Sequence, residues 1–256
     1  MVPALCSNFD INLIWLILAG FFAGFINTIA GGGTLLTLPA LIFMGLPPSV
    51  ANGTNRIAIF LQTVTGVAGF KSKGVTTFPF SIYCGISALF GSLIGAKIAI
   101  DIKGETFNKI LAITMVAVVF LILFKPRVKV DDLIERTTGK YLWISIIGFF
   151  FLGIYGGFIN AGIGFLIIIF ITYVTRMNLV RTNAAKLTIV SIYTFGALLM
   201  FYFNDKINWK YCLIMSIGNI AGAWISSRLA VKKGDKYIRM FLVVMIFVMA
   251  IKLWFF

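Results

Sequence analysis

Three residue types are missing or scarce in this chain of 256 residues, which has no histidine, eight acidic residues and three cysteines. Without histidine, Ser-His and Cys-His nucleophiles, histidine haem ligands and histidine proton relays are excluded. Cys6, Cys84 and Cys212 lie far apart without a CxxC spacing, so neither a disulfide framework nor a thiolate metal site is predicted. We expect a protein that is not an enzyme and that holds no metal or cofactor.

The few carboxylates avoid the apolar segments. Each lies between two apolar runs or at the end of one. A carboxylate at membrane depth is costly and usually serves ion or proton transport. A carboxylate-based proton or cation relay is therefore not expected. The acidic residues are Asp10, Asp101, Glu105, Asp131, Asp132, Glu135, Asp205 and Asp235.

Apolar residues dominate the composition. Hydrophobic residues make up 60% of the chain, charged residues make up 12%, and the mean hydropathy is +1.02, which excludes a water-soluble domain. The net charge of +14 comes from Lys and Arg placed singly in loops and at the ends of apolar runs. This placement predicts contact with the lipid headgroups of a cell membrane and no nucleic-acid binding, with an anionic solute as the alternative partner.

Eight apolar segments are candidate membrane spans. Two of them, 12–44 and 141–175, would each be about 50 Å long as one helix, well beyond a hydrocarbon core of about 30 Å. Glycines interrupt both segments, so we predict a broken helix or a re-entrant turn in each. The segments are 12–44, 56–70, 78–100, 106–124, 141–175, 187–203, 209–230 and 237–256.

The two halves of the chain resemble each other. A shift of 131 residues aligns Gly31 with Gly162, Gly33 with Gly164, and Asn52 with Asn183. We therefore expect an all-α integral membrane bundle of about eight transmembrane helices, built from a duplicated four-helix unit whose first helix is broken by glycine. The expected boundaries are 1–124 for the first repeat, 125–140 for the linker and 141–256 for the second repeat.

Short motifs recur in both halves as well. The tetrapeptide Gly-Phe-Ile-Asn ends at Asn27 and again at Asn160, just before each glycine break. Small residues spaced four apart let transmembrane helices approach closely, so helix packing is predicted for them. They are Gly20 and Gly24, Gly153 and Gly157, and later Ser87, Gly91 and Gly95 with Gly218, Gly222 and Ser226.

Two topologies fit this duplication. If each glycine-broken segment crosses once, the chain has eight spans and parallel halves; if each is a hairpin, it has ten spans and inverted halves. The lysines of 97–109 and the basic stretch 228–239 correspond at the 131-residue shift, so the positive-inside rule favours one side for both and the eight-span topology. Against it, the basic loop 125–140 would then face outward.

Polar groups that suit an anion accompany each glycine break. The break frees backbone N–H groups, and the next helix presents its positive dipole end, although a plain kink is the alternative. The following span opens with a polar stretch, 51–56 or 182–187, that carries one cation, Arg56 or Lys186. Asn and Thr suit helix N-caps, whereas a cation is disfavoured there. We therefore expect an anion beside each cation, with a lipid headgroup as the alternative.

Two stretches in each half form recognisable motifs. The first half contains Gly-Gly-Gly-Thr-Leu-Leu-Thr-Leu-Pro-Ala-Leu at 31–41 and Gly-Leu-Pro-Pro-Ser-Val-Ala-Asn-Gly-Thr-Asn at 45–55, and the second half contains similar stretches at 157–165 and 180–186. These stretches resemble the signatures of the TauE/SafE family, which is described as sulfite and organosulfonate permeases. The resemblance implies a multi-pass transporter of the cytoplasmic membrane for a small anion such as a sulfur oxyanion. Pro39 falls opposite Phe170, so the halves need not bind substrate equivalently.

We expect both breaks and both polar stretches to converge near the membrane midplane on one anion site that works by alternating access. An anion channel and a non-transporting assembly subunit are the alternatives, and association of the chain with copies of itself stays open. The predicted substrate-binding residues are Gly31, Gly32, Gly33, Thr34, Asn52, Thr54, Asn55, Arg56, Gly162, Gly164, Asn183 and Lys186.

Overall fold

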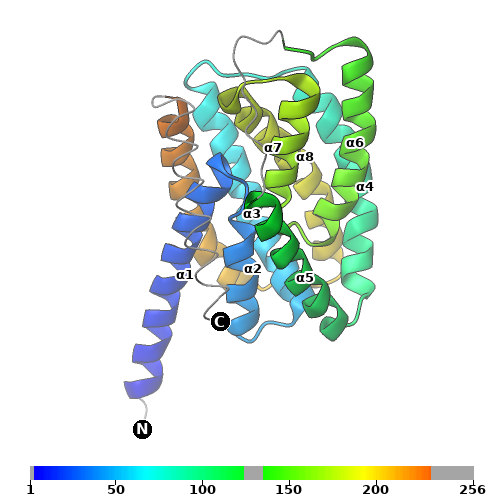
Figure 1. The fold of residues 1–256 in the computed structure, drawn as a ribbon. Coiled ribbons are helices and arrows are strands. Elements are labelled where there is room, and N and C mark those ends of the chain that lie inside the picture. The colour runs from blue at the N-terminus through cyan, green and yellow to red at the C-terminus, as the bar shows by residue number, and fades with distance from the viewer. Residues whose placement is uncertain (1–2, 124–134, 232–256) are drawn as a thin grey trace.

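The computed structural model describes residues 3–123 and 135–231, and every regular element within them is a helix (Figure 1). Seven predicted spans become nine helical segments in this part of the chain, because two of the spans are divided. The eighth predicted span, 237–256, lies outside the described residues. The helices are α1 (Pro3–Ile29), α2 (Thr34–Phe43), α3 (Pro48–Lys71), α4 (Phe80–Asp101), α5 (Gly104–Leu123), α6 (Gly139–Phe158), α7 (Ile163–Thr175), α8 (Leu179–Phe203) and a segment at 209–231.

Each divided span forms a hairpin. A Cβ atom at Gly33 would lie 2.7 Å from the Cβ of Asn27, so the chain turns back on α1 as α2 begins. The N–H of Arg136 donates to the carbonyl oxygen of Thr175 over 2.8 Å, which joins the start of α6 to the end of α7. With 10 and 13 residues, α2 and α7 span only about 15 to 20 Å. They are therefore the short return arms of the two hairpins.

Helices α3 and α8 correspond at the 131-residue shift, and they run in opposite directions. Near the start of α3, Thr54 Oγ1 accepts a hydrogen bond of 2.9 Å from the N–H of Asn208, just beyond the end of α8. Towards the end of α3, a Cβ atom at Gly66 would lie 2.7 Å from the side chain of Leu187, near the start of α8. Corresponding helices of parallel halves would run the same way. The eight-span parallel topology favoured by the sequence is therefore wrong, and these helices have the inverted arrangement.

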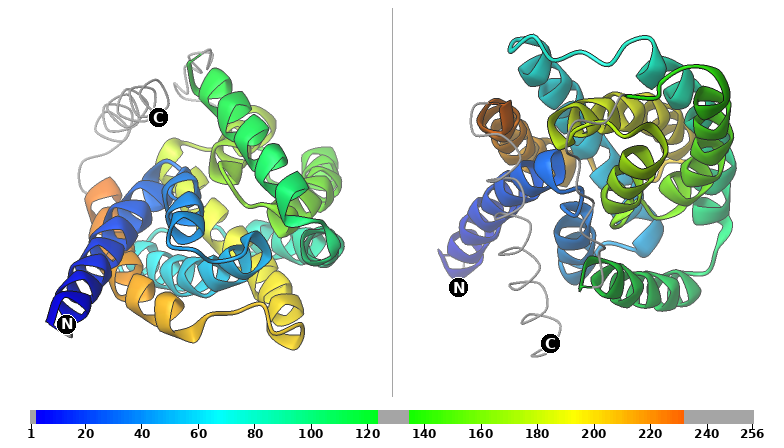
Figure 2. Two further views of the ribbon diagram at one scale, coloured as in Figure 1. Left: turned by 90° about the horizontal axis from the view of Figure 1, so that it is seen from below. Right: turned by 45° about the horizontal axis from the view of Figure 1, so that its top comes forward.

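A close helix pair flanks α3 and α8 on either side (Figure 2). On one side α4 and α6 run parallel, and Ser87 Oγ donates to the carbonyl oxygen of Ile146 over 2.6 Å near their starts. On the other side α1 packs on the 209–231 helix, where a Cβ atom at Gly24 would lie 2.7 Å from the Cα of Asn219. Small residues let the two backbones of each pair approach closely.

The inverted arrangement also explains why the positive-inside argument failed. Lys97 lies near the end of α4, at the lower end of the bundle in Figure 1. Arg228 lines a recess together with Lys73, which follows α3 at the upper end. Lys97 and Arg228 correspond at the 131-residue shift, yet they lie at opposite ends. The assumption that both basic stretches share one side is therefore contradicted.

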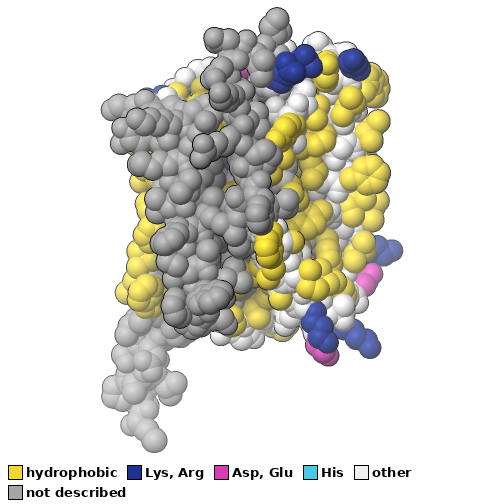
Figure 3. Space-filling model, viewed as in Figure 1, with side chains coloured by type: hydrophobic (Ala, Val, Ile, Leu, Met, Phe, Trp, Pro, Cys, Tyr) yellow, Lys and Arg dark blue, Asp and Glu magenta, His cyan; other side chains and the backbone are white. Residues whose placement is uncertain are grey.

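On the face of the bundle that Figure 3 shows, the described side chains between the two ends are mostly apolar, and Lys and Arg gather at the edges of this apolar surface. Trp143, Phe151 and Ile113 are 66%, 64% and 69% exposed, which is unfavourable in water and favourable in hydrocarbon. By length and composition, α4, α6 and α8 are apolar enough to cross a bilayer. The fold is that of an integral membrane helical bundle.

Candidate functional site

The two polar stretches that were predicted to begin helices lie inside them instead. Because α3 begins at Pro48 and α8 at Leu179, Arg56 and Lys186 lie about two turns into their helices. The N-cap of α8 is Asn178, which precedes the predicted stretch. The N-cap interpretation of these stretches is therefore wrong. The cations of both stretches are buried against the ends of other helices, where they find hydrogen-bond acceptors. Helices α3 and α8 therefore continue through the two polar stretches.

Arg56 is fully buried and binds the end of α6. Its Nη1 and Nη2 atoms donate to the carbonyl oxygens of Gly156 and Gly157 over 2.7 and 2.6 Å. Asn52 Nδ2 donates to the next carbonyl, that of Phe158, over 2.7 Å. The last carbonyl groups of a helix have no partner within it and carry its negative dipole end. Arg56 and Asn52 therefore cap the C-terminus of α6.

Lys186 caps the C-terminus of the other broken helix, α1. Its Nζ atom donates to the carbonyl oxygens of Asn27 and Thr28, at the end of α1, over 2.8 and 2.9 Å. It also donates to Asn183 Oδ1 over 2.8 Å, so each of the three N–H groups of the ammonium has an acceptor. Each half of the chain thus supplies the cation that caps the broken helix of the other half. The headgroup alternative is contradicted, because both cations are buried within protein.

Arg56 and Lys186 do not lie together. The residue after Lys186, Leu187, packs against Gly66 of α3. Gly66 lies about 15 Å from Arg56 along the axis of α3, at about 1.5 Å per residue. The structure therefore separates the two polar stretches that the sequence analysis assigned to one site. They lie apart because α3 and α8 are antiparallel.

The two breaks, in contrast, meet at a crossing point formed by Gly31 and Gly164. A Cβ atom at Gly31 would lie 2.3 Å from the carbonyl carbon of Gly164, and one at Gly164 would lie 2.2 Å from the Cα of Gly31. Gly31 also has a φ of +90°, which residues with a Cβ rarely adopt. Beside this contact, Asn160 Nδ2 reaches Thr34 Oγ1 over 3.5 Å. The two hairpin turns are therefore in direct contact.

Two further hydrogen bonds involve residues that the sequence analysis did not assign to the site. Asn27 Nδ2 donates to Gln62 Oε1 over 3.0 Å, and Tyr193 Oη donates to Asn160 Oδ1 over 2.7 Å. Gln62 and Tyr193 correspond at the 131-residue shift. The repeated Gly-Phe-Ile-Asn motif, together with one polar side chain at matching positions downstream, is the signal that could have identified all four.

Other predicted site residues accept hydrogen bonds from backbone N–H groups or form a helix cap. Thr54 accepts a backbone hydrogen bond from the segment after α8. The carbonyl oxygens of Gly32 and Gly33 accept from the first turn of α2. Gly162 is the N-cap of α7, with a φ of +69°, and packs against Val118 of α5. The three glycines therefore shape the hairpins, and Thr54 joins α3 to the segment after α8.

Several buried polar atoms near the breaks have no hydrogen-bond partner among residues 3–123 and 135–231. Both amide atoms of Asn55 are unpaired, and so are Arg56 Nε, Gln62 Nε2 and Asn183 Nδ2. Leaving a buried polar group unpaired costs roughly 1–3 kcal/mol, so such groups call for water or a ligand. All of these atoms except Asn55 Oδ1 are hydrogen-bond donors, which favours an anion.

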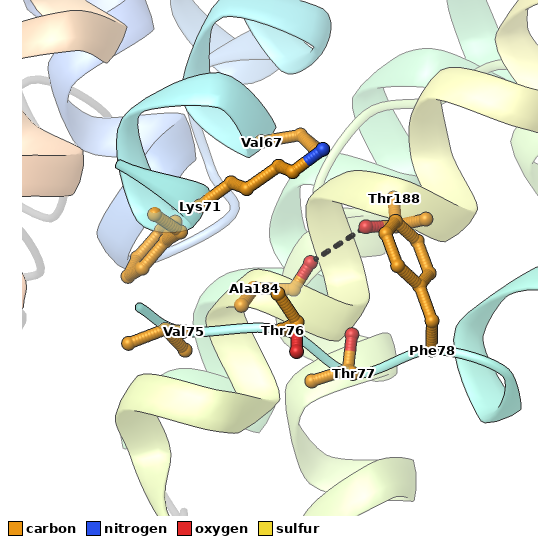
Figure 4. A pocket seen from close by; sticks show the side chains of 9 residues that line it. Val67, Lys71, Val75, Thr76, Thr77, Phe78, Ala184 and Thr188 are labelled. Carbon is orange, nitrogen blue, oxygen red and sulfur yellow. Dashed lines mark hydrogen bonds between the residues drawn. The ribbon is translucent and has the colours of Figure 1, made fainter. Parts of the chain in front are cut away.

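A small recess lies between the end of α3 and the start of α8 (Figure 4). Lys71 extends over it from α3, and on α8 Thr188 Oγ1 donates to the carbonyl oxygen of Ala184 over 3.1 Å. Its volume of about 10 Å³ holds roughly one water molecule. In the described part of the chain, no group of His, Cys, Asp or Glu side chains could bind a metal ion.

The apolar outer surface, the paired hairpins and the buried polar centre define an integral membrane protein built as transporters are. The chain belongs to the TauE/SafE family. Residues 16–253 match the family described as sulfite exporter TauE/SafE.

Similar proteins carry transporter names. A probable membrane transporter protein of Haemophilus influenzae is 30% identical over 234 residues, which cover 91% of each chain. Probable membrane transporter protein YfcA of Escherichia coli is 30% identical over 239 residues, 93% of this chain and 88% of that protein. Probable membrane transporter protein ORF9 of a Sinorhizobium species is 27% identical over 241 residues, 94% of this chain and 92% of that protein. No solved structure matches this chain. The protein is therefore a membrane transporter of this family.

Proposed function

We propose that the protein is a multi-pass permease of the cytoplasmic membrane that moves a small sulfur oxyanion, sulfite or an organosulfonate, by alternating access. The observation that carries this proposal is the set of buried, unpaired hydrogen-bond donors beside the two breaks. The description of the family as sulfite exporters supports the choice of a sulfur oxyanion. A non-transporting assembly subunit would have no use for such donors at its centre.

The charge at the centre of the bundle also favours an anion. Arg56 is fully buried, and none of the carboxylates whose burial the structure describes is buried with it; these are Asp101, Glu105, Glu135 and Asp205. The described residues form two ion pairs, Lys109 with Glu105 and Arg181 with Glu135, and the side chains of both pairs are at least partly exposed. The carbonyl groups at the end of α6 carry about half a negative charge, so they compensate Arg56 only in part. A small anion would complete the compensation.

Transport on this proposal requires the crossing point to open. Gly31 and Gly164 touch, so the hairpins close the centre of the bundle in this structure. Because Arg56 holds α6 and Lys186 holds α1, each hairpin is tied to the other half of the chain. Rocking one half against the other would have to release these hydrogen bonds as it separates the breaks and exposes the unpaired donors to one side at a time.

The experiment is uptake of labelled sulfite into proteoliposomes that hold the purified protein, with the membrane voltage set in both directions. We expect saturable flux that follows the voltage and that other sulfur oxyanions inhibit. Arg56→Met should reduce the flux at least about tenfold, because a hydrogen bond to a charged group is worth about 1.5–3 kcal/mol. Lys103→Met removes an exposed cation and serves as the control.

Arg56→Lys separates charge from geometry, since it keeps the cation but cannot donate to two successive carbonyl groups as a guanidinium does. Its flux should lie between those of the wild type and Arg56→Met. Absence of flux for every sulfur oxyanion tested, from folded and inserted wild-type protein, would contradict the permease. Flux that does not saturate would indicate an anion channel instead.

A further inference from the structure

Asn55 occupies the middle of the polar face of α3. On the same face, Asn52 and Arg56 bind the end of α6, and Gln62 binds Asn27 at the end of α1. Asn55 follows Asn52 by three residues and precedes Gln62 by seven, spacings that place all three on one side of a helix. Asn55 therefore lies on the face of α3 that meets the ends of the two broken helices.

The side-chain amide of Asn55 is a buried polar group on this face. The residue is 1% exposed, and neither Oδ1 nor Nδ2 has a hydrogen-bond partner among the residues that the structure describes. An amide is at once a donor and an acceptor, so a single ligand satisfies it fully when that ligand offers both an acceptor and a donor. The neighbouring Arg56 adds an unpaired Nε donor and one positive charge.

We propose that this centre selects a monoanionic sulfur oxyanion that itself carries a hydrogen-bond donor, and that Asn55 recognises this donor. Asn55 Oδ1 accepts from the donor of the anion, while Asn55 Nδ2 and Arg56 Nε donate to its oxygens. For sulfite, the selected species is the singly protonated ion and not the dianion. This inference rests on the proposed function and narrows its substrate class.

Both charge and hydrogen bonding favour this species. A monoanion and Arg56 form a neutral pair, whereas a dianion leaves one negative charge at membrane depth, where charge is costly. An anion without a donor would leave Asn55 Oδ1 buried and unpaired. For this reason, a site that hydrogen-bonds one group of its substrate strongly rejects an analogue that lacks this group.

Two probes of equal charge and similar shape test the proposal. Sulfamate and methanesulfonate are both monoanions, and they differ in that an amino group with N–H donors replaces a methyl group. As competitors of labelled sulfite uptake in proteoliposomes, we expect sulfamate to inhibit at concentrations at least about tenfold lower than methanesulfonate. Sulfate, a dianion without a donor, should be the weakest inhibitor.

Variants of Asn55 localise the effect. Asn55→Leu removes donor and acceptor at similar volume, so the two monoanions should inhibit its remaining uptake equally. Asn55→Ser keeps a donor and an acceptor and should keep the preference for sulfamate. Asn108→Leu makes the same chemical change at an exposed position of α5 and should behave like the wild type.

The outcomes separate this inference from the proposed function. If wild-type protein transports sulfite and both monoanions inhibit equally, the inference is overturned and the permease stands. If the wild type transports no sulfur oxyanion, the permease is contradicted, and the melting temperature in each probe still decides the inference, because a bound ligand stabilises the folded protein. If Asn55→Leu does not fold, the wild-type comparison and Asn55→Ser decide it.

Discussion

At the residue scale, the contact between the two hairpins leaves no room for one extra carbon atom. Gly31 and Gly45 both have a φ of +90°, but a Cβ atom at Gly45 would meet nothing within 4 Å, whereas one at Gly31 would lie 2.3 Å from Gly164. Gly31→Ala and Gly45→Ala therefore carry the same backbone strain of about 1–2 kcal/mol. Gly31→Ala adds overpacking worth about 1–3 kcal/mol.

We therefore expect Gly31→Ala to lower the melting temperature clearly more than Gly45→Ala and to reduce sulfite uptake. Thermal unfolding of the two purified variants measures the difference. Equal melting temperatures would mean that the crossing point is not packed as described.

The cap of α1 by Lys186 is a second prediction at this scale. Lys186→Met leaves the carbonyl oxygens of Asn27 and Thr28 without their buried donor. Each unpaired buried group costs about 1–3 kcal/mol, so we expect a destabilisation of about 3 kcal/mol. Lys103→Met, at an exposed position, should change the melting temperature little. Similar unfolding curves for the two variants would show that Lys186 does not cap α1.

At the scale of helices, small residues determine how closely α4 and α6 pack. A Cβ atom at Gly153 would lie 2.2 Å from the carbonyl oxygen of Ala88. Association of membrane helices depends on van der Waals packing, because lipid is as apolar as the side chains. Gly153→Val should therefore separate the pair and lower the melting temperature by several degrees. Phe151→Val, at an exposed position of α6, should leave it nearly unchanged; a comparable loss there would argue against the close pair.

The sequence predicted that such small residues pack, but not which helices they join. Spacing within one helix shows which face is small, and it carries no information about the partner. The same limit explains the error at 51–56 and 182–187. A polar stretch after a loop is typical of a helix start. Arg56 nevertheless lies inside α3, because the carbonyl groups of Gly156 and Gly157 accept hydrogen bonds from its guanidinium.

At the scale of the whole molecule, the two ends of the bundle differ in charge. More Lys and Arg residues lie at the upper end than at the lower end among the described residues, and the acidic side chains lie mainly at the lower end. The positive-inside rule then predicts that the upper end faces the cytoplasm. Beside the helix ends that lie at the top of Figure 1 are Lys71, Lys73, Arg136, Lys140, Arg176, Arg181 and Arg228, with Glu135; beside the helix ends at the bottom are Lys97, Lys103, Lys109, Lys206 and Lys210, with Asp101, Glu105 and Asp205.

Labelling with a membrane-impermeant maleimide tests this orientation. In a background without the native cysteines, the variant Lys103→Cys should react in intact cells, whereas Lys73→Cys should react only after permeabilisation. The reverse pattern would show that the lower end, and not the upper end, faces the cytoplasm. Reaction of both variants from one side would contradict the placement of their loops at opposite ends.

By itself, the sequence determined the class of the protein. Its apolar runs required an integral membrane helical protein, because hydrocarbon satisfies no backbone polar group and helices satisfy their own. The motifs at 31–41 and 45–55 identified the family. These are local properties, since length, hydropathy and motif need no knowledge of neighbours.

Only the tertiary structure decided in which direction each helix runs and which groups each buried cation binds. The antiparallel course of α3 and α8 separated Arg56 from Lys186 and gave each cation the carbonyl groups of a broken helix from the other half. Hydropathy is the same whichever way a span runs, so the sequence could not distinguish parallel from inverted halves. Asn55 became distinctive only when its buried surroundings showed that no group in the described part of the chain satisfies it.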